Sequence, residues 1–74
     1  MKPGKRQRAI LTAIQGGELR QEDGAWSIYT ADGAWYAADR ARCMALYAAG
    51  YIMADGVTVG GRIRYTLTEK GKRA

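Results

Sequence analysis

Lysine and arginine residues are the side chains of this sequence whose type and spacing point most clearly to a chemistry. Guanidinium and ammonium groups contact phosphates and release the counterions that surround a polyanion. Arginines two residues apart on a strand share one face, and cations near a helix start can serve one ligand. We take seven of them as candidate DNA-binding residues: Lys5, Arg6, Arg8, Arg40, Arg42, Arg62 and Arg64.

Catalytic and metal-binding chemistry is poorly represented in the chain. The sequence has no histidine, which is the commonest general base near neutral pH, and it has one cysteine, Cys43. One thiolate cannot form a tetrahedral zinc site or an internal disulfide. Glycine-rich phosphate loops and nucleophile motifs are also missing from the sequence. We therefore expect no enzyme, no metal and no cofactor, and we expect Cys43 to be a small buried side chain.

The charge is concentrated at the two ends of the sequence. The net charge is +5, with +4 in residues 1–8, +4 in residues 62–74 and −3 between them. Basic ends favour a polyanion such as double-stranded DNA. A surface that only keeps the protein soluble is the alternative explanation of the same charges.

Length and hydropathy limit the class of protein. A chain of 74 residues makes one domain, and a domain this small buries only about 60% of its unfolded surface. A second subunit would help to stabilise it, so a homodimer stays open. We expect neither a signal peptide nor a membrane span, and one free cysteine fits a cytoplasmic protein.

The first half of the chain predicts one helix followed by strands. Apolar residues recur at helical spacing over 5–15, Gly16-Gly17 ends that segment, and residues 1–4 are expected to be disordered. Residues 19–36 lack a helical period, and Asp-Gly-Ala-Trp occurs in them twice, at 23–26 and 32–35. Asp-Gly is a strong turn signal, so we expect two turns on either side of a strand near 25–30.

Residues 37–52 predict a second helix, because alanine, arginine, methionine and leucine favour that conformation. Asp39 suits its start and Gly50 its end. One stripe is apolar, and we expect the sheet, the first helix or a second subunit to cover it. Its members are Ala41, Met44, Ala45 and Ala48, widened by Leu46 and Ala49.

The last third predicts a β-hairpin whose strands are 57–59 and 62–68, joined by Gly60-Gly61. Alternation places Ile63, Tyr65 and Leu67 on one face of the second strand. Arg62, Arg64 and Thr66 then share the other face, where they would meet solvent or phosphate. Thr68 is expected to cap a short final helical turn.

Two motifs resemble those of winged helix–turn–helix domains of the MarR and PadR type. Leu46, Gly50, Tyr51 and Ile52 match the end of the family's recognition helix. The second wing strand and the start of its helix are matched by Tyr65, Leu67, Thr68 and Gly71. The resemblance covers residues 38–71 and implies a small α+β winged-helix-like domain, with two main helices and a short antiparallel sheet that includes the wing hairpin. It further implies that Arg40 and Arg42 lie on the recognition helix and that Arg62 and Arg64 lie on the wing.

The chain departs from this family where residues 19–36 replace the first helix of the helix–turn–helix. The predicted reading helix also has no Asn, Gln, Ser or Thr to recognise base edges. Two functions stay open. The first is a small, phage-like regulator of transcription that binds double-stranded DNA largely through phosphates. The second is a protein-interaction module, or a small inhibitor such as an anti-CRISPR protein, that uses the same fold to bind a protein partner.

Overall fold

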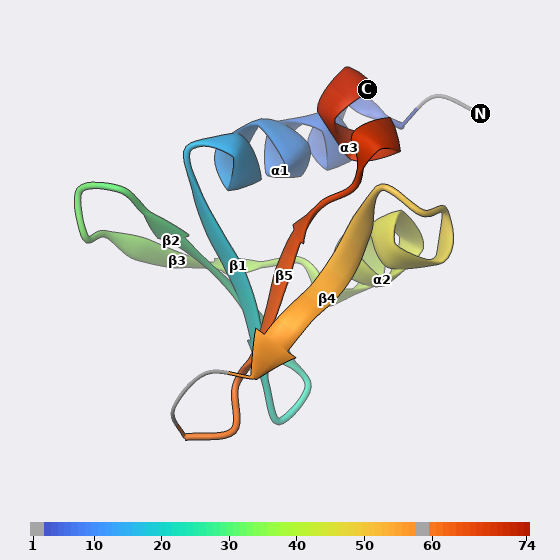
Figure 1. Cartoon of the computed structure of the whole chain (residues 1–74). Coiled ribbons are helices and arrows are strands. Elements are labelled where there is room, and N and C mark those ends of the chain that lie inside the picture. The colour runs from blue at the N-terminus through green and yellow to red at the C-terminus, as the bar shows by residue number, and fades with distance from the viewer. Residues whose placement is uncertain (1–2, 58–59) are drawn as a thin grey trace.

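The computed structural model describes residues 3–57 and 60–74, and in these residues it contains three helices and a five-stranded antiparallel sheet. Figure 1 shows α1 and α3 at one end of the molecule and α2 beside the sheet. Along the chain the elements are α1 (Lys5–Gln15), β1 (Gly17–Glu22), β2 (Ala25–Thr30), β3 (Trp35–Ala38), α2 (Arg40–Ala48), β4 (Ile52–Val57), β5 (Ile63–Leu67) and α3 (Glu69–Arg73). The α+β class is therefore confirmed, with two main helices and, in α3, the short final helical turn capped by Thr68 that the sequence predicts.

The sheet has the strand order β3-β2-β1-β5-β4, so β1 lies at its centre. Leu19 of β1 faces Ile28 on one side and Tyr65 on the other. Asp23 and Gly24 close the β1–β2 hairpin, and both have positive φ, at 51° and 81°. A two-residue turn with this geometry matches the twist of the strands, which is why Asp-Gly suits the position.

One face of the sheet forms the core with the helices. Its buried side chains are Leu19, Trp26, Ile28, Ile52 and Tyr65, and α1 and α2 add Leu11, Ile14, Cys43 and Leu46. Side chains at the alternate positions lie on the opposite face, which we call the outer face. The sheet thus has one apolar face under the helices and one polar face.

The second helix is shorter than the sequence predicts. Residues 35–38 belong to β3, and α2 ends at Ala48 instead of residue 52. Gly50 has φ 85°, and its N–H donates to the Tyr47 carbonyl while the Tyr51 N–H donates to the Leu46 carbonyl. This pair of bonds is the Schellman motif, which stops a helix and turns the chain. Asp39 is the N-cap residue, but its side chain makes no capping bond.

The C-terminal hairpin also differs in its first strand. β4 begins at Ile52 and ends at Val57, whereas the sequence predicts a strand at 57–59; Thr58 and Val59 lie outside the described residues. The second strand is confirmed at Ile63–Leu67, with Tyr65 buried and Ile63 packed against the core. At the other end of the chain, residues 1–2 are likewise outside the described part, and Gly4 is the N-cap of α1.

Thr68 joins the end of α2 to the start of α3. Its hydroxyl accepts from the Gly71 N–H at 3.1 Å and donates to the Gly50 carbonyl at 2.6 Å. The Thr68 N–H donates to the Tyr51 carbonyl, and the Lys70 ammonium donates to the Ala49 carbonyl. The two motifs that resemble winged-helix domains are therefore in direct contact, and we call this contact the Gly50–Thr68 junction.

Gly71 tests the junction because its α-carbon lies against the Tyr51 backbone. A methyl group at residue 71 would overlap the Tyr51 carbonyl oxygen, while a methyl group at Gly16 would meet open space at φ −100°. We expect Gly71→Ala to lower the free energy of unfolding by about 1–3 kcal/mol, since α3 must shift. Gly16→Ala is the matched control, with a change within about 1 kcal/mol. Urea denaturation measures both, and equal midpoints for the two variants would show that α3 is not held here.

Candidate functional site

The hairpin arginines are paired with carboxylates of the same chain. The Arg62 Nε lies 2.8 Å from Glu22 Oε2 across the sheet. Arg64 lies 3.5 Å from Glu18 Oε1 and 3.7 Å from Asp55 Oδ2, and it also donates to the Asp55 carbonyl. The predicted faces of β5 are therefore confirmed, while the arginine face is already matched with negative charge.

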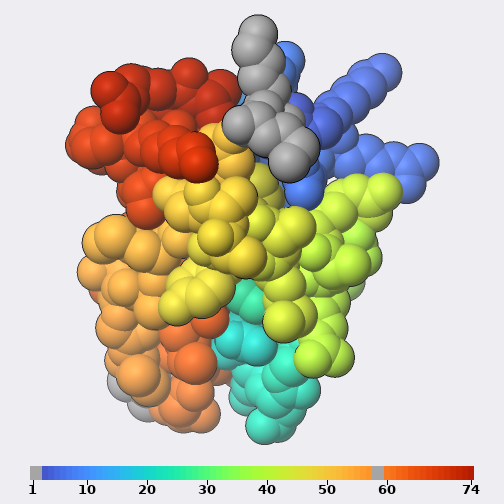
Figure 2. Space-filling model, turned by 90° about the vertical axis from the view of Figure 1, so that its right-hand side faces the viewer, coloured from blue at the N-terminus to red at the C-terminus, as the bar shows by residue number. Residues whose placement is uncertain are grey.

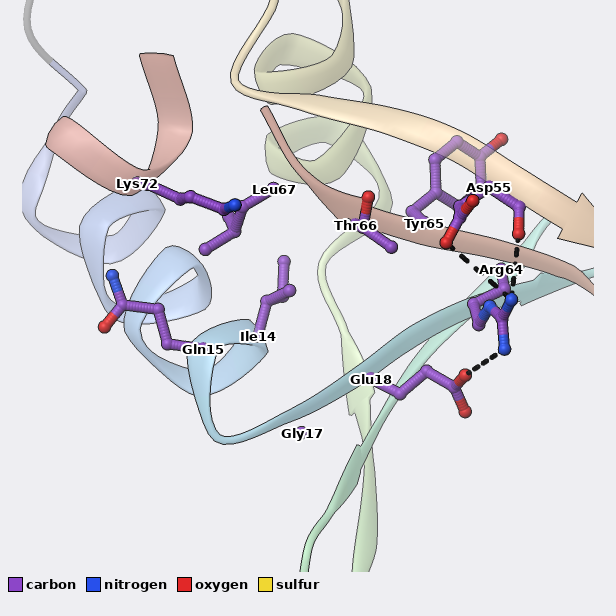
Figure 3. A pocket seen from close by; sticks show the side chains of 10 residues that line it. All are labelled: Ile14, Gln15, Gly17, Glu18, Asp55, Arg64, Tyr65, Thr66, Leu67 and Lys72. Carbon is purple, nitrogen blue, oxygen red and sulfur yellow. Dashed lines mark hydrogen bonds and ion pairs between the residues drawn. The ribbon is translucent and has the colours of Figure 1, made fainter. Parts of the chain in front are cut away.

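Figure 3 shows Arg64 between Glu18 and Asp55, beside a cavity of about 700 Å³. The cavity lies between α1, β1 and β5, and Ile14 and Leu67 supply apolar walls. The Arg64 Nε is buried without a hydrogen-bond partner. Ion pairs on a protein surface contribute about 0–1 kcal/mol, so this pairing matters more for the local charge than for stability.

Arg42 on α2 is paired in the same way, with Asp39 three residues earlier. Arg40 is exposed and has no carboxylate partner in the described part of the chain. Of the two cations that the resemblance places on a recognition helix, one is thus neutralised by its neighbour.

The cations of α1 differ from these arginines. Lys5, Arg6 and Arg8 are exposed, and none of them has an ion pair within residues 3–57 and 60–74. The first turn of α1 contains no acidic residue, so these cations oppose the positive end of the helix dipole. An external anion would relieve that repulsion.

The seven predicted DNA-binding residues do not form one surface. α1 lies at one end of the molecule, and the end of β4 and the start of β5 lie at the opposite end (Figure 1). The predicted set therefore consists of an unpaired group on α1, a mixed pair on α2 and a paired group on the hairpin. Arg6 of α1 and Arg42 of α2 line one groove, while the hairpin arginines lie elsewhere.

The outward side of α2 is apolar and uncovered. Of the stripe predicted to be covered, only Leu46 is buried; its other members are exposed, because α2 faces the core through Cys43 and Leu46. We call the uncovered surface the α2 face, and its members are Ala41, Met44, Ala45, Tyr47 and Ala48. Met44 is 48% exposed and Tyr47 52% exposed. Figure 2 shows α2, in yellow, open to solvent at the middle of the molecular face turned toward the viewer.

The position of α2 explains why the prediction failed. The helix has nine residues and sits beside the sheet, so one narrow side faces the core (Figure 1). Cys43 and Leu46 are three residues apart and occupy that side, while Met44 and Ala48 are turned away. In an alanine-rich helix, the spacing of apolar residues allows either side of the helix to face the core. The sequence alone therefore did not determine which side of α2 is buried.

Aromatic side chains on the outer face were not part of the predicted site. The Tyr29 and Trp35 rings stack at 6.3 Å, and the Arg20 guanidinium lies 4.3 Å from the centre of the Tyr29 ring. Arg20 is also paired with Glu18. The alternation of β1 and β2 could have revealed this cluster, since Arg20 and Tyr29 each follow a buried core residue.

A groove of about 300 Å³ lies between α1 and β3. Its walls are mainly apolar, and three charged residues, Arg6, Asp39 and Arg42, complete the lining. Tyr36, one of the wall residues, is 46% exposed. The remaining wall residues are Ala9, Ile10, Ile28, Ala37 and Ala38.

Other chemistry is limited among residues 3–57 and 60–74. These residues contain no group of three or more His, Cys, Asp or Glu side chains that could hold a metal ion. They also contain no helix with the length and apolar character needed to cross a bilayer.

Comparison with known proteins gives no relative. No family model matches the chain, and no match was found among curated proteins or solved structures.

Cys43 is free and fully buried, as the sequence predicts for a packing residue. Burial, with a smaller contribution from the nearby Asp39 carboxylate, raises the pKa of its thiol to about 11. Since the thiolate is the reactive form, we expect the folded protein at pH 8 to react with a thiol reagent roughly a hundredfold more slowly than the urea-unfolded protein. Above about pH 8.5 the unfolded thiol ionises first, so the free energy of unfolding should fall as the pH rises toward 11. Equal labelling rates for folded and unfolded protein would contradict the burial.

Proposed function

We propose that this protein is a protein-interaction module that docks on a protein partner through the α2 face. One observation carries the proposal: Met44 and Tyr47 are about half exposed on a helix whose other exposed positions, apart from Arg40 at its start, are alanines. Small monomeric proteins usually keep such contiguous apolar surface covered or use it for binding.

The composition of the α2 face suits a protein surface better than a DNA groove. Base edges are recognised by hydrogen bonds from Arg, Lys, Asn, Gln, Ser or Thr. The α2 face itself has none of these residues. Of the two arginines beside it, Arg42 is held by Asp39, while Arg40, one turn before Met44, is exposed and has no carboxylate partner among the described residues. Aromatic and methionine side chains are enriched at protein interfaces, and alanines let a partner helix or strand approach closely.

The electrostatics of the hairpin support the same choice. Three arginines of the sheet form ion pairs with carboxylates of the same sheet. Arg20 and Arg64 pair with Glu18, Arg62 pairs with Glu22, and Arg64 also pairs with Asp55. A phosphate that came here would have to displace carboxylates, and there is little excess positive charge to attract it.

DNA binding by a winged-helix-like regulator is the second candidate, and one observation favours it. Lys5, Arg6 and Arg8 carry unpaired charge on α1 in a chain of net charge +5. In this case the phosphate contacts would come mainly from α1 and from Arg40, and the binding would depend steeply on salt without strong sequence preference.

A matched pair of variants tests the α2 face. Ala45→Glu places a charge within the face, and Ala31→Glu makes the same change in the exposed β2–β3 turn. We expect the wild type and Ala31→Glu to recover the same stoichiometric partner in a pull-down from the native host, and Ala45→Glu to lose it. Sedimentation of the purified protein alone measures its oligomeric state, and so shows whether the partner is a second copy of this chain or a different protein. Recovery of that partner by Ala45→Glu at the wild-type level would reject the α2 face.

A second pair of variants tests the DNA alternative. Titration of labelled random duplex DNA over a salt series should give no measurable affinity at about 0.15 M salt. If DNA does bind at low salt, Lys5→Gln with Arg8→Gln should weaken it and reduce the salt slope by about two. Arg62→Gln with Arg64→Gln should weaken it less, because those cations are matched by carboxylates. Tight binding of duplex DNA at about 0.15 M salt that is lost with Arg62→Gln and Arg64→Gln would contradict this proposal. It would instead support DNA binding in the winged-helix mode.

A further inference from the structure

We propose that the free edge of β3 is a second docking site, which takes an extended acidic peptide as a sixth strand of the sheet. The site comprises the outer edge of β3 and the groove between β3 and α1. The groove includes Arg42 of α2 but none of the side chains of the α2 face, so this site adds to the proposed function and does not depend on it.

The hydrogen-bonding pattern shows which groups of β3 are open. The Thr30 N–H donates to the Ala34 carbonyl, and bonded pairs then alternate along the β2–β3 ladder. Tyr36 and Ala38 accordingly direct their backbone groups to β2. The N–H and C=O groups of Trp35 and Ala37 point away from the sheet, where an incoming strand would pair with them.

The two edges of the sheet are protected differently. At the β4 edge the pairing is irregular between Ala54 and Val57, and Asp55 adds a charge. Irregularities and charges of this kind prevent an edge from accepting another strand. β3 has the sequence Trp-Tyr-Ala-Ala, with regular pairing over its whole length and no charged or proline residue. The β3 edge is therefore the one that is open to strand addition.

The groove would receive alternate side chains of the added strand. Tyr36 and Ala38 lie on the core side of β3, and side chains opposite them would enter the groove beside Ile10 and Ala9. These walls favour small or β-branched apolar residues. The side chains between them would lie on the outer face, next to Trp35, which is 62% exposed.

The positive charge of the residues that line the groove favours an acidic peptide segment as the ligand. Arg6 lines the groove and has no carboxylate partner within the described residues. Arg42, which lines the same groove, forms an ion pair with Asp39. The two guanidinium groups exceed the one carboxylate, so an Asp or Glu side chain or a C-terminal carboxylate of the peptide would complete the set. A second copy of β3 has no acidic residue of its own to offer within the strand.

A selection from random octapeptides displayed on phage tests this site against the full chain. We expect enriched peptides to alternate apolar residues and to contain Asp or Glu near one end. The enriched sequence is then made as a labelled synthetic peptide, and its affinity is measured by fluorescence polarisation.

Variants of the edge and of the groove separate the two parts of the site. Ala37→Pro removes an outward N–H without removing a bond to β2, and Ala37→Val keeps that N–H as the matched control. We expect at least a tenfold loss of affinity with Ala37→Pro and with Arg6→Glu, and little change with Ala37→Val or with Ala45→Glu. Far-ultraviolet circular dichroism confirms that each variant is folded.

Several outcomes would overturn the proposal. They are a selection without enrichment, an enriched set without acidic residues, and binding that Ala37→Pro does not reduce. Loss of peptide binding with Ala45→Glu would show that the peptide binds at the α2 face and not at the β3 edge. A dimer of the free chain that Ala37→Pro dissociates would show that a second copy occupies the edge.

Discussion

The Gly50–Thr68 junction is the contact on which the rest of this molecule depends. The Thr68 hydroxyl caps α3 and bonds the Gly50 carbonyl, and Gly71 packs on the Tyr51 backbone. Because Gly50 ends α2 at this point, the helix has nine residues and the chain enters β4 at once. So short a helix buries two side chains and leaves its other sides to solvent. The exposed apolar surface is a consequence of where the helix stops.

Charge placement adds a second constraint on function. The outer face of the sheet balances its arginines against carboxylates. The excess positive charge lies on α1, on α3, where three cations accompany one acidic residue, and at Arg40 of α2. A protein that held DNA by its second helix and hairpin would need the opposite arrangement, with free cations there and no apolar stripe between them. The apolar α2 face and the open β3 edge are both more suitable for protein partners, which is why we favour that class.

The sequence predicted the local structure well where one residue type decides it. The helix at 5–15, the Asp-Gly turns and the alternation of β5 around Tyr65 follow from backbone and burial preferences that neighbours do not change. The orientation of α2 could not be read in this way, because alanines at Ala41, Ala45 and Ala48 are compatible with either side of a helix. Glu22 lies 40 residues before Arg62 and Glu18 lies 46 residues before Arg64, so this pairing between β1 and β5 could not be predicted from local spacing. The residues that produced the winged-helix resemblance turn out to build the junction, which explains why they indicate local structure more strongly than DNA binding.

Methionine methyl groups give the most direct test of the central claim that the α2 face meets protein and not DNA. Met44 lies on that face, and Met53 lies on β4 as an internal reference. With ¹³C-labelled methionine methyls, NMR spectra should show a shift or broadening of Met44 when the captured partner is added, with Met53 less affected. Random duplex DNA at about 0.15 M salt should leave both signals in place. A Met44 signal that responds to DNA and ignores the partner would contradict the account.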